Sequence, residues 1–246
     1  YSYWLAFFVA IAAGALLGVF LDLVVMRPLS NKKQTELLSS QSMRSAVPVI
    51  ASLGILGVLQ ALAGVIWAAE ERGFQAPFAQ EGYTFAGRVM PFTSFDLFVV
   101  TVVVITLILT VLFFKKTGVG LAMRASALDQ EVAKLSGIRT NGVRALSWAI
   151  SGAASSLAGL LLTPTSNLSP YTLDLALIIG FTAAVVGGLD SLPGSVIGGF
   201  ILGFVISFVN YYMTPEDIYL AILAVLIFVL IVRPRGILGG KDTRRV

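Results

Sequence analysis

Cysteine and histidine are both absent from the 246 residues of this chain. Without cysteine, the chain can form no disulfide framework, no zinc–thiolate site and no thiol nucleophile. Without histidine, it has no imidazole metal ligand, no serine–histidine–aspartate triad and no histidine proton switch. These two absences exclude many common catalytic and metal-binding sites before any sequence pattern is considered.

Charged residues are also scarce, since Asp, Glu, Lys and Arg make up only 12% of the chain while 57% is hydrophobic. Soluble domains contain about 25% charged residues. Half that density cannot cover a water-soluble surface of this size, so the composition predicts a membrane protein. The formal net charge is +4. Because membrane topology accounts for this positive charge, we expect no binding to nucleic acid.

Seven apolar segments are candidates for helices that cross the bilayer, which requires about 20 residues each. The fifth and seventh are short, and Gly180, Gly187 and Gly188 interrupt the fifth, so that segment either crosses or re-enters the membrane. We therefore predict an all-α polytopic bundle, with a single membrane domain over 1–246 and no linker. The segments are 4–26, 46–69, 95–114, 145–163, 173–189, 196–213 and 219–232.

Basic residues lie on alternate connections between these segments. All of the 17 Lys and Arg residues except Arg72 and Arg88 fall in 27–45, 115–144 or the tail 233–246. Because excess positive charge marks the cytoplasmic side, we expect a cytoplasmic C-terminus and residue 1 outside. The sequence starts at Tyr1 within an apolar segment and shows no signal peptide, so we interpret it as a fragment that lacks an N-terminal element.

No ionisable residue lies at the centre of a predicted span; Asp22, Asp96, Asp174 and Asp190 are all near span ends. We expect water to solvate these carboxylates, so that none carries a coupling ion. This disfavours a proton-driven carrier, whereas Na⁺ coupling through backbone carbonyls stays open. A nucleophile–base pair is missing, which argues against an enzyme. The sequence after Gly239 also fails the phosphate-binding loop pattern.

Small residues recur at helical spacing, as in the pairs 14/18, 194/198 and 199/203 and the stretch 151–159. Such stripes allow close helix packing in membranes. The alternative is a tight central bundle, or an interface between homologous subunits, around a substrate path. The candidates for a pathway or for helix packing are Gln60, Ser151, Ser155, Gly187, Gly188, Gly194, Gly198 and Asn210.

The connection 115–144 contains the pattern of an amphipathic helix over 121–136. Its apolar stripe consists of Leu121, Ala125, Leu128, Val132 and Leu135, spaced by four and three residues. Glycines 118 and 120 loosen its entry, and Gly137 before an apolar residue suits a left-handed C-cap. The helix either lies on lipid headgroups or docks into a groove of a cytosolic partner.

Four motifs resemble those of permeases in ATP-binding-cassette importers of the branched-chain amino acid family. Residues 120–138 resemble the family's cytoplasmic signature, G-x-x-x-R-A-x-x-x-D-x-x-x-A-x-x-x-G-I. Residues 186–199 resemble its V-x-G-G-x-G-S-x-x-G segment, with Asp190 where a small residue is common. Residues 233–239 resemble its R-P-x-G-L-x-G ending, and 26–29 its first cytoplasmic turn. Members usually open with another helix pair, which this sequence lacks.

The resemblance implies a multi-pass subunit of a bacterial-type cytoplasmic (inner) membrane importer, without enzymatic activity or cofactor of its own. It implies a second permease, the same or homologous, two cytosolic ATPase subunits and an extracytoplasmic substrate-binding protein. The segment 121–136 would be the coupling helix. The resemblance assigns charged contacts or braces to Arg124 and Asp129, close packing to Ala125 and Ala133, and the helix ends to Gly120 and Gly137.

Branched-chain amino acids are the first choice of substrate that the resemblance implies, with urea or short amides as alternatives. Two other classes remain open. One is a secondary transporter or channel for a small neutral solute that works without ATPases. The other is a membrane scaffold subunit with no transport path.

Overall fold

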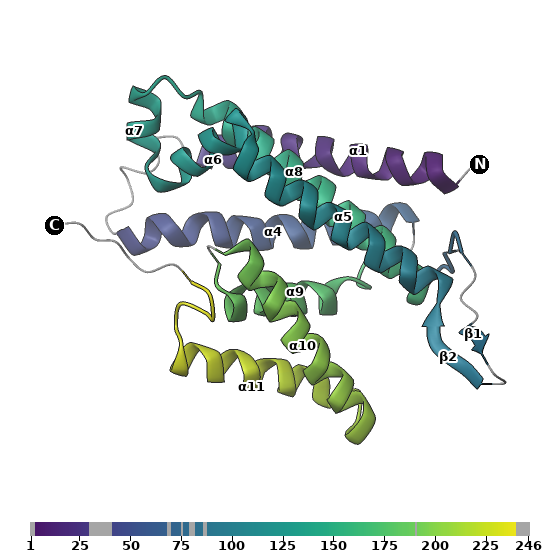
Figure 1. The fold of residues 1–246 in the computed structure, drawn as a ribbon. Coiled ribbons are helices and arrows are strands. Elements are labelled where there is room, and N and C mark those ends of the chain that lie inside the picture. The colour runs from purple at the N-terminus through teal and green to yellow at the C-terminus, as the bar shows by residue number, and fades with distance from the viewer. Residues whose placement is uncertain are drawn as a thin grey trace. The chain divides into compact units, whose positions relative to one another are not determined.

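A computed structural model describes residues 3–29, 41–67, 70–74, 76–78, 82–85, 88–189 and 191–239. The regular elements of the described residues are all helices apart from one β-hairpin (Figure 1). It divides into two compact units, Tyr1–Pro170 and Tyr171–Val246.

The first unit begins with α1 (Tyr3–Leu21), which continues through a π-helical turn, η1 (Asp22–Met26), into the short α2 (Arg27–Leu29). Next come α4 (Gln41–Trp67), the hairpin strands β1 (Gly82–Phe85) and β2 (Arg88–Thr93), and α5 (Ser94–Lys116). The unit continues with α6 (Gly118–Leu128), α7 (Gln130–Leu135), α8 (Thr140–Leu162) and the 3-10 turn η2 (Thr163–Thr165). The second unit contains α9 (Asp174–Gly187), α10 (Leu192–Tyr212) and α11 (Asp217–Val232).

All seven predicted apolar segments contain helix, and five helices in the described part of the chain are long and apolar enough to cross a membrane. These are Tyr3–Leu29, Val49–Trp67, Ser94–Lys116, Thr140–Thr165 and Leu192–Tyr212. The remaining two, α9 and α11, have 14 and 16 residues. The predicted interruption at Gly180 is wrong, because α9 runs through that residue and ends at Gly187. The chain is a multi-pass helical membrane protein.

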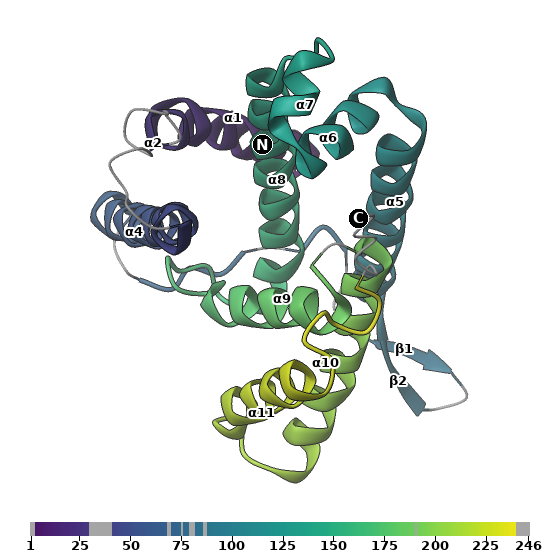
Figure 2. The same ribbon diagram turned by 90° about the vertical axis from the view of Figure 1, so that its left-hand side faces the viewer.

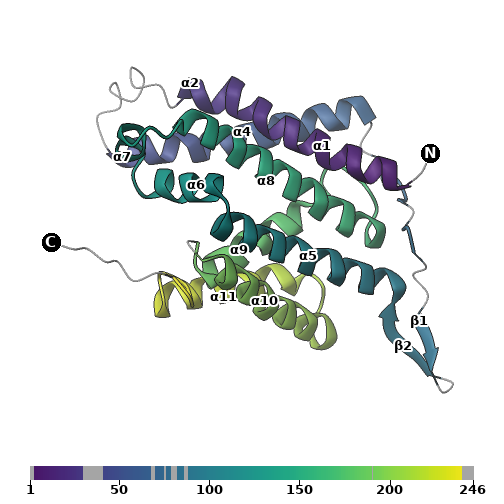
Figure 3. The same ribbon diagram turned by 45° about the horizontal axis from the view of Figure 1, so that its top comes forward.

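Glycines bring α1 and α8 into backbone contact, and the two helices lie side by side in Figures 1 and 3. A Cβ atom on Gly14 would fall 2.6 Å from the carbonyl oxygen of Gly152. One on Gly18 would fall directly against the carbonyl of Trp148. The predicted packing role of the pair 14/18 is therefore confirmed, because only glycine leaves room for this approach.

The hairpin was not predicted from the sequence. Its strands pair antiparallel, with an irregular register between Gly82 and Thr84, and it extends from the start of α5 (Figure 2). A capping box fixes the transition into α5: the backbone N–H of Asp96 donates to the Thr93 hydroxyl, and the Thr93 backbone N–H donates to the Asp96 carboxylate at 2.9 Å. Asp96 thus has a structural role at a helix N-terminus.

In the second unit, α9 and α10 approach each other through glycines. A Cβ atom on Gly187 would fall against Gly194, and one on Gly198 would fall against the carbonyl of Ala183. For the pair 194/198, these contacts support the packing alternative. Nothing lies within 4 Å of the Cβ position of Gly199 or Gly203, so that pair makes no such contact within the described residues. Beyond this crossing, Val209, Ile218 and Ile222 form a small core between α10 and α11.

Candidate functional site

A sharp bend at Thr117 separates α5 from α6. The Thr117 backbone is extended, and its hydroxyl donates to the carbonyl of Phe113 at 2.6 Å and accepts the N–H of Gly120 at 3.0 Å. A Cβ atom on Gly120 would fall 2.7 Å from the Cα atom of Phe114. Gly120 therefore allows α6 to pack closely on the end of α5. The expectation that it loosens the entry is wrong.

The predicted single helix over 121–136 is divided into α6 and α7 at Asp129. This residue is extended, with φ −155°, and its Oδ1 accepts the N–H groups of Glu131 at 2.8 Å and Val132 at 3.1 Å. An aspartate that caps the first turn of a new helix competes with the continuous helix that the spacing predicts. Of the two roles that the resemblance gave Asp129, a local brace is the one its hydrogen bonds support.

The predicted C-cap at Gly137 is confirmed. Gly137 has φ +81°, and its N–H donates to the carbonyl of Lys134, while the N–H of Ile138 donates to the carbonyl of Ala133, both at 3.0 Å. These two bonds form a Schellman motif. Ala133 is only 3% exposed, in keeping with a close-packing position. The motif fixes the direction in which the chain leaves α7 and enters α8.

Four large apolar side chains of the predicted stripe are exposed on α6 and α7, and we call them the α6–α7 surface: Leu121, Leu128, Val132 and Leu135. Leu128 and Leu135 are the most exposed, each at 89%. Arg124 is also exposed, whereas Ala125 is half-buried. The break at Asp129 means that these side chains do not form a single-helix stripe. They nevertheless give this short segment an apolar surface that the rest of the first unit leaves uncovered.

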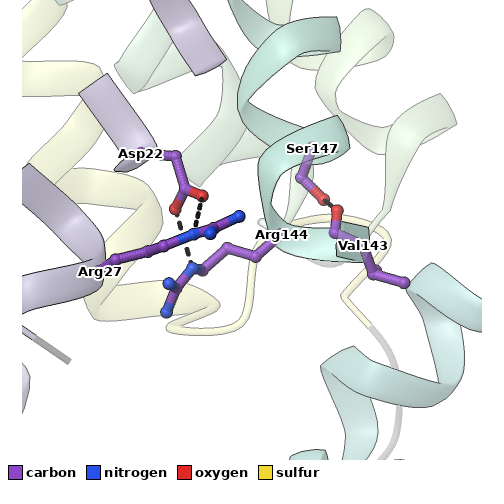
Figure 4. Close-up of polar contacts among 5 residues, drawn as sticks. All are labelled: Asp22, Arg27, Val143, Arg144 and Ser147. Carbon is purple, nitrogen blue, oxygen red and sulfur yellow. Dashed lines mark hydrogen bonds and ion pairs between the residues drawn. The ribbon is translucent and has the colours of Figure 1, made fainter. Parts of the chain in front are cut away.

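A buried charge cluster lies where η1 meets the first turns of α8, and sequence analysis missed it. The Asp22 side chain is fully buried, and it accepts hydrogen bonds from Arg144 Nε at 2.8 Å and Arg27 Nε at 3.3 Å. Figure 4 shows the two guanidinium groups converging on this carboxylate. The expectation that water solvates every carboxylate at a span end is therefore wrong for Asp22. The cluster contains one carboxylate, and the described ranges contain no group of three or more acidic side chains placed to hold a metal ion.

The π-turn explains how Asp22 and Arg27 meet. In an α-helix, residues five apart lie about 140° apart around the axis, which separates their side chains. In η1 the backbone N–H of Arg27 donates to the carbonyl of Asp22, so the wider turn brings the two residues onto one side. Pro28 accounts for the widening, since its ring clashes with the carbonyl four residues earlier and it has no N–H to donate. Pro28, directly after Arg27, was the signal in the sequence from which the π-turn could have been predicted.

The predicted pathway residues lie on three helices. Ser151 and Ser155 are one turn apart on α8, and both are exposed, while Gln60 is half-buried on α4. Asn210 is exposed on α10 of the second unit. On α8, the exposed serines lie next to Gly152, which contacts α1. This helix therefore has a packed small-residue side and an open small polar side.

The first unit also contains a cleft of about 260 Å³ beside the end of α4. Two backbone hydrogen bonds between Arg72 and Leu168, of 3.0 and 2.8 Å, join the segment after α4 to the segment after α8. Asn167 donates to Glu71 at 2.8 Å and strengthens this junction. Most of the lining is apolar, with Glu70 and Arg72 as its charged members; the other lining residues are Ala63, Trp67, Leu168, Ser169 and Pro170.

In the second unit, the motif over 186–199 is in direct contact with the motif over 233–239. The N–H of Ile237 donates to the carbonyl of Val186 at 2.9 Å, and the N–H of Leu238 donates to the carbonyl of Gly187 at 3.0 Å. A Cβ atom on Gly188 would fall 2.8 Å from the Gly239 nitrogen. The tail after α11 therefore packs on the end of α9. Gly187, Gly188, Gly194 and Gly198 all lie at such close contacts, which support the packing alternative; Asp190 lies outside the described residues.

Comparisons with known proteins agree with the motifs. The family model for the branched-chain amino acid transport system permease component matches residues 1–231. The high-affinity branched-chain amino acid transport system permease protein LivH of Escherichia coli K12 is 40% identical over 136 residues, which cover 55% of this chain and 44% of LivH. The chain thus matches less than half the length of that relative. No solved structure matches the chain.

Two further relatives match over more of the chain. The probable branched-chain amino acid transport permease protein LivH of Methanocaldococcus jannaschii is 35% identical over 207 residues, covering 80% of this chain and 66% of the relative. The permease protein BraD of Pseudomonas aeruginosa, from a high-affinity branched-chain amino acid transport system, is 29% identical over 246 residues, covering 98% and 76%. Since the family model covers nearly the whole sequence, this chain belongs to the family of branched-chain amino acid transport system permease components.

Proposed function

We propose that this chain is a pathway subunit of a binding-protein-dependent, ATP-driven importer for branched-chain or related amino acids. It lies in the cytoplasmic (inner) membrane and pairs with a second permease, the same or homologous. Cytosolic ATPase subunits bind and hydrolyse ATP, an extracytoplasmic protein delivers the substrate, and this chain holds no cofactor. The observation that carries the proposal is the α6–α7 surface, exposed between two spanning helices in a chain of this family.

The distribution of charge in the first unit supports this orientation. Figure 3 draws α2, α6 and α7 at one end of the unit and the hairpin at the other. Arg27, Lys115 and Arg144 lie at the α6–α7 end, as expected for a cytoplasmic side. The cleft beside Trp67 then lies on the extracytoplasmic side. Seven crossings, with α9 and α11 as short spans, leave the basic tail in the cytoplasm.

The exposed leucines favour docking to a protein over contact with lipid headgroups. An interfacial helix needs one continuous apolar face along its length, and the break at Asp129 divides this segment into two short helices. A groove on a partner can receive two short helices joined at a fixed angle. Burying a leucine side chain contributes about 1.5–3 kcal/mol, so Leu128 and Leu135 are the side chains whose burial stabilises the complex most.

We expect Leu128→Asp to detach the ATPase subunits while the permease stays folded. The side chain is 89% exposed, so the substitution removes no internal packing, but it places a charge where the partner buries an apolar group. Retention of the ATPase on the purified permease and the thermal stability of the permease alone are the measurements.

Ala127→Asp is the matched control, because Ala127 is the exposed neighbour of Leu128 in α6 and receives the same charge. Lys134→Ala is a second control, on an exposed polar position of α7. If Leu128→Asp retains the ATPase as well as both controls do, the surface faces lipid and the docking proposal is wrong.

The open side of α8 supports a role for Ser151 and Ser155 in lining the pathway. A helix side that faces lipid usually carries large apolar residues, as α5 does with Leu97, Val104 and Ile108 exposed. Two exposed hydroxyls one turn apart suit a hydrated path instead. Gln60 and Asn210 are the further polar candidates. Loss of uptake on Ser155→Leu, with the complex still assembled, would eliminate the scaffold alternative.

The alternative of a secondary transporter or channel predicts a different energy source. In a reconstituted complex with its binding protein, we expect uptake of labelled leucine to depend on ATP and to persist when the proton and sodium gradients are collapsed. Uptake that stops when either gradient is collapsed, while ATP remains, would overturn the importer proposal. Competition of labelled leucine uptake by excess urea or a short amide tests the substrate class in the same vesicles.

A further inference from the structure

We propose that the Asp22–Arg144 ion pair positions η1 against α8 and thereby transmits movement of the α6–α7 pair to α1. The inference rests on the proposed function, because it concerns how ATP hydrolysis in a partner is coupled to the membrane helices. Asp22 and Arg144 are positioning residues, which act through the helices they join and not by touching the substrate or the partner.

The ion pair joins two parts of the chain that are far apart in sequence. Asp22 and Arg144 are 122 residues apart, and the guanidinium of Arg144 donates to Asp22 Oδ1 at 2.8 Å. The Asp22 side chain is fully buried, and the Arg144 side chain is 25% exposed. A charged hydrogen bond of this length, withdrawn from water, is among the stronger side-chain contacts that a protein makes. It is therefore suited to carry force between two helices.

A continuous series of fixed contacts leads from α7 to this ion pair. The Schellman motif at Gly137 sets the exit from α7, and the N–H of Thr140 then donates to the carbonyl of Ile138 at 2.9 Å. The Thr140 residue is buried, and α8 starts there, so Arg144 lies in its second turn. A displacement of α7 must move this end of α8, because these backbone hydrogen bonds hold the short connection between them. Arg144 passes that displacement to Asp22.

On the other side of the ion pair lies the π-turn, a type of helix irregularity that is frequent at functional sites. Asp22 is its first residue, and Arg27 closes it through both its backbone N–H and its guanidinium. Beyond it, α1 is packed backbone-to-backbone on α8 at Gly14 and Gly18. This packing keeps η1 beside the start of α8, and η1 is the segment that can change its hydrogen bonds when the start of α8 is displaced.

Two matched substitutions separate the transmitting contact from the local one. Arg144→Gln removes the contact between η1 and α8, while Asp22 keeps Arg27 as its charged partner. Arg27→Gln removes a contact with the same carboxylate that spans only the π-turn, from the first residue of η1 to the first residue of α2. We measure substrate imported per ATP hydrolysed by the complete complex in vesicles. Arg144→Gln should lower this ratio at least about fivefold, the lower end of typical coupling between sites, whereas Arg27→Gln should leave it within about twofold of the unsubstituted complex.

The ratio distinguishes transmission from simple destabilisation. A variant that merely folds less well gives fewer complexes, so uptake and ATP hydrolysis fall together and the ratio is unchanged; that result for Arg144→Gln would overturn the inference. Asp22→Asn should lower the ratio like Arg144→Gln, and the conservative Asp22→Glu should restore it. If Arg27→Gln lowers the ratio as much as Arg144→Gln, the cluster acts only locally and the inference is also wrong.

The same experiment separates this inference from the proposed function. If the unsubstituted complex imports leucine with ATP and Arg144→Gln leaves the ratio unchanged, only the inference fails. If the unsubstituted complex hydrolyses no ATP in response to substrate, the proposed function fails and the inference fails with it.

Discussion

Replacing Gly236 by alanine should strongly destabilise the second unit, because the new methyl group meets both backbone strain and a packed neighbour. Gly236 has φ +78°, a left-handed conformation that costs a non-glycine residue about 1–3 kcal/mol. A Cβ atom there would also fall against the backbone of Gly188 and 2.8 Å from the carbonyl of Val185. Forcing an extra methyl into such a packed site costs about 1–3 kcal/mol more.

Gly137→Ala is a closely matched control for this prediction. Its φ of +81° is nearly the same, but nothing lies within 4 Å of its Cβ position, so the substitution introduces backbone strain alone. Hydrogen exchange of the Ile237 and Leu238 amides reports the tail contact directly, because these amides donate to Val186 and Gly187. We expect Gly236→Ala to accelerate their exchange and lower the thermal midpoint, and Gly137→Ala to leave their exchange unchanged. Equal effects of the two substitutions would show that the tail is not held by this packing.

Features that depend on local sequence could be predicted well. Long apolar runs predicted the positions of the helices, since hydrophobic length is the main requirement for crossing a bilayer. Glycine spacing predicted which faces of α1 and α10 make close contacts, and Gly137 before Ile138 predicted the end of α7. In each case the residues that decide the structure are close together in the chain.

Predictions failed where a single polar side chain overrode a periodic pattern, or where the partner is distant in sequence. The spacing of Leu121, Leu128 and Leu135 fits one helix, yet Asp129 caps a new helix between them. Asp22 was expected in water because it lies near the end of a predicted span, but its strongest partner, Arg144, is 122 residues away. Charge counting assigned Arg144 to the connection before the fourth predicted span but could not pair it with a particular carboxylate.

In the candidate site too, features that depend on local sequence were predicted, whereas contacts between distant segments were not. The apolar stripe over 121–136 predicted a set of side chains that needs cover from lipid or a partner, and the structure exposes Leu128 and Leu135 in the same segment. The motifs at 186–194 and 233–239 gave no sign of their contact, because no periodicity connects α9 to the tail. That contact, through Ile237 and Leu238, is made between backbone atoms. Side-chain identity therefore gives no direct signal for it, apart from the glycines that the approach requires.

Replacing Gly18 by alanine should destabilise the contact between α1 and α8, whereas the same change at Gly57 should not. The new methyl at Gly18 meets the carbonyl of Trp148. Since backbone cannot rotate away as a side chain can, the helices must separate, at a cost of about 1–3 kcal/mol. Gly57 lies within α4 with nothing inside 4 Å of its Cβ position, so alanine there is neutral or gains up to about 1 kcal/mol in helix propensity.

Thermal unfolding of the two purified variants in the same detergent measures this difference in stability. The amount of substrate imported per ATP hydrolysed measures its consequence for transport. Gly18 lies one turn before Asp22 on the same continuous helix. Separation of α1 from α8 at Gly18 therefore lengthens the distance that the Asp22–Arg144 ion pair must span. If the Asp22–Arg144 ion pair transmits movement, Gly18→Ala should lower both the thermal midpoint and the substrate imported per ATP. Gly57→Ala should lower neither quantity. A Gly18→Ala protein as stable as Gly57→Ala would mean that α1 and α8 are not in backbone contact, and the route from α7 to α1 would lose its physical basis.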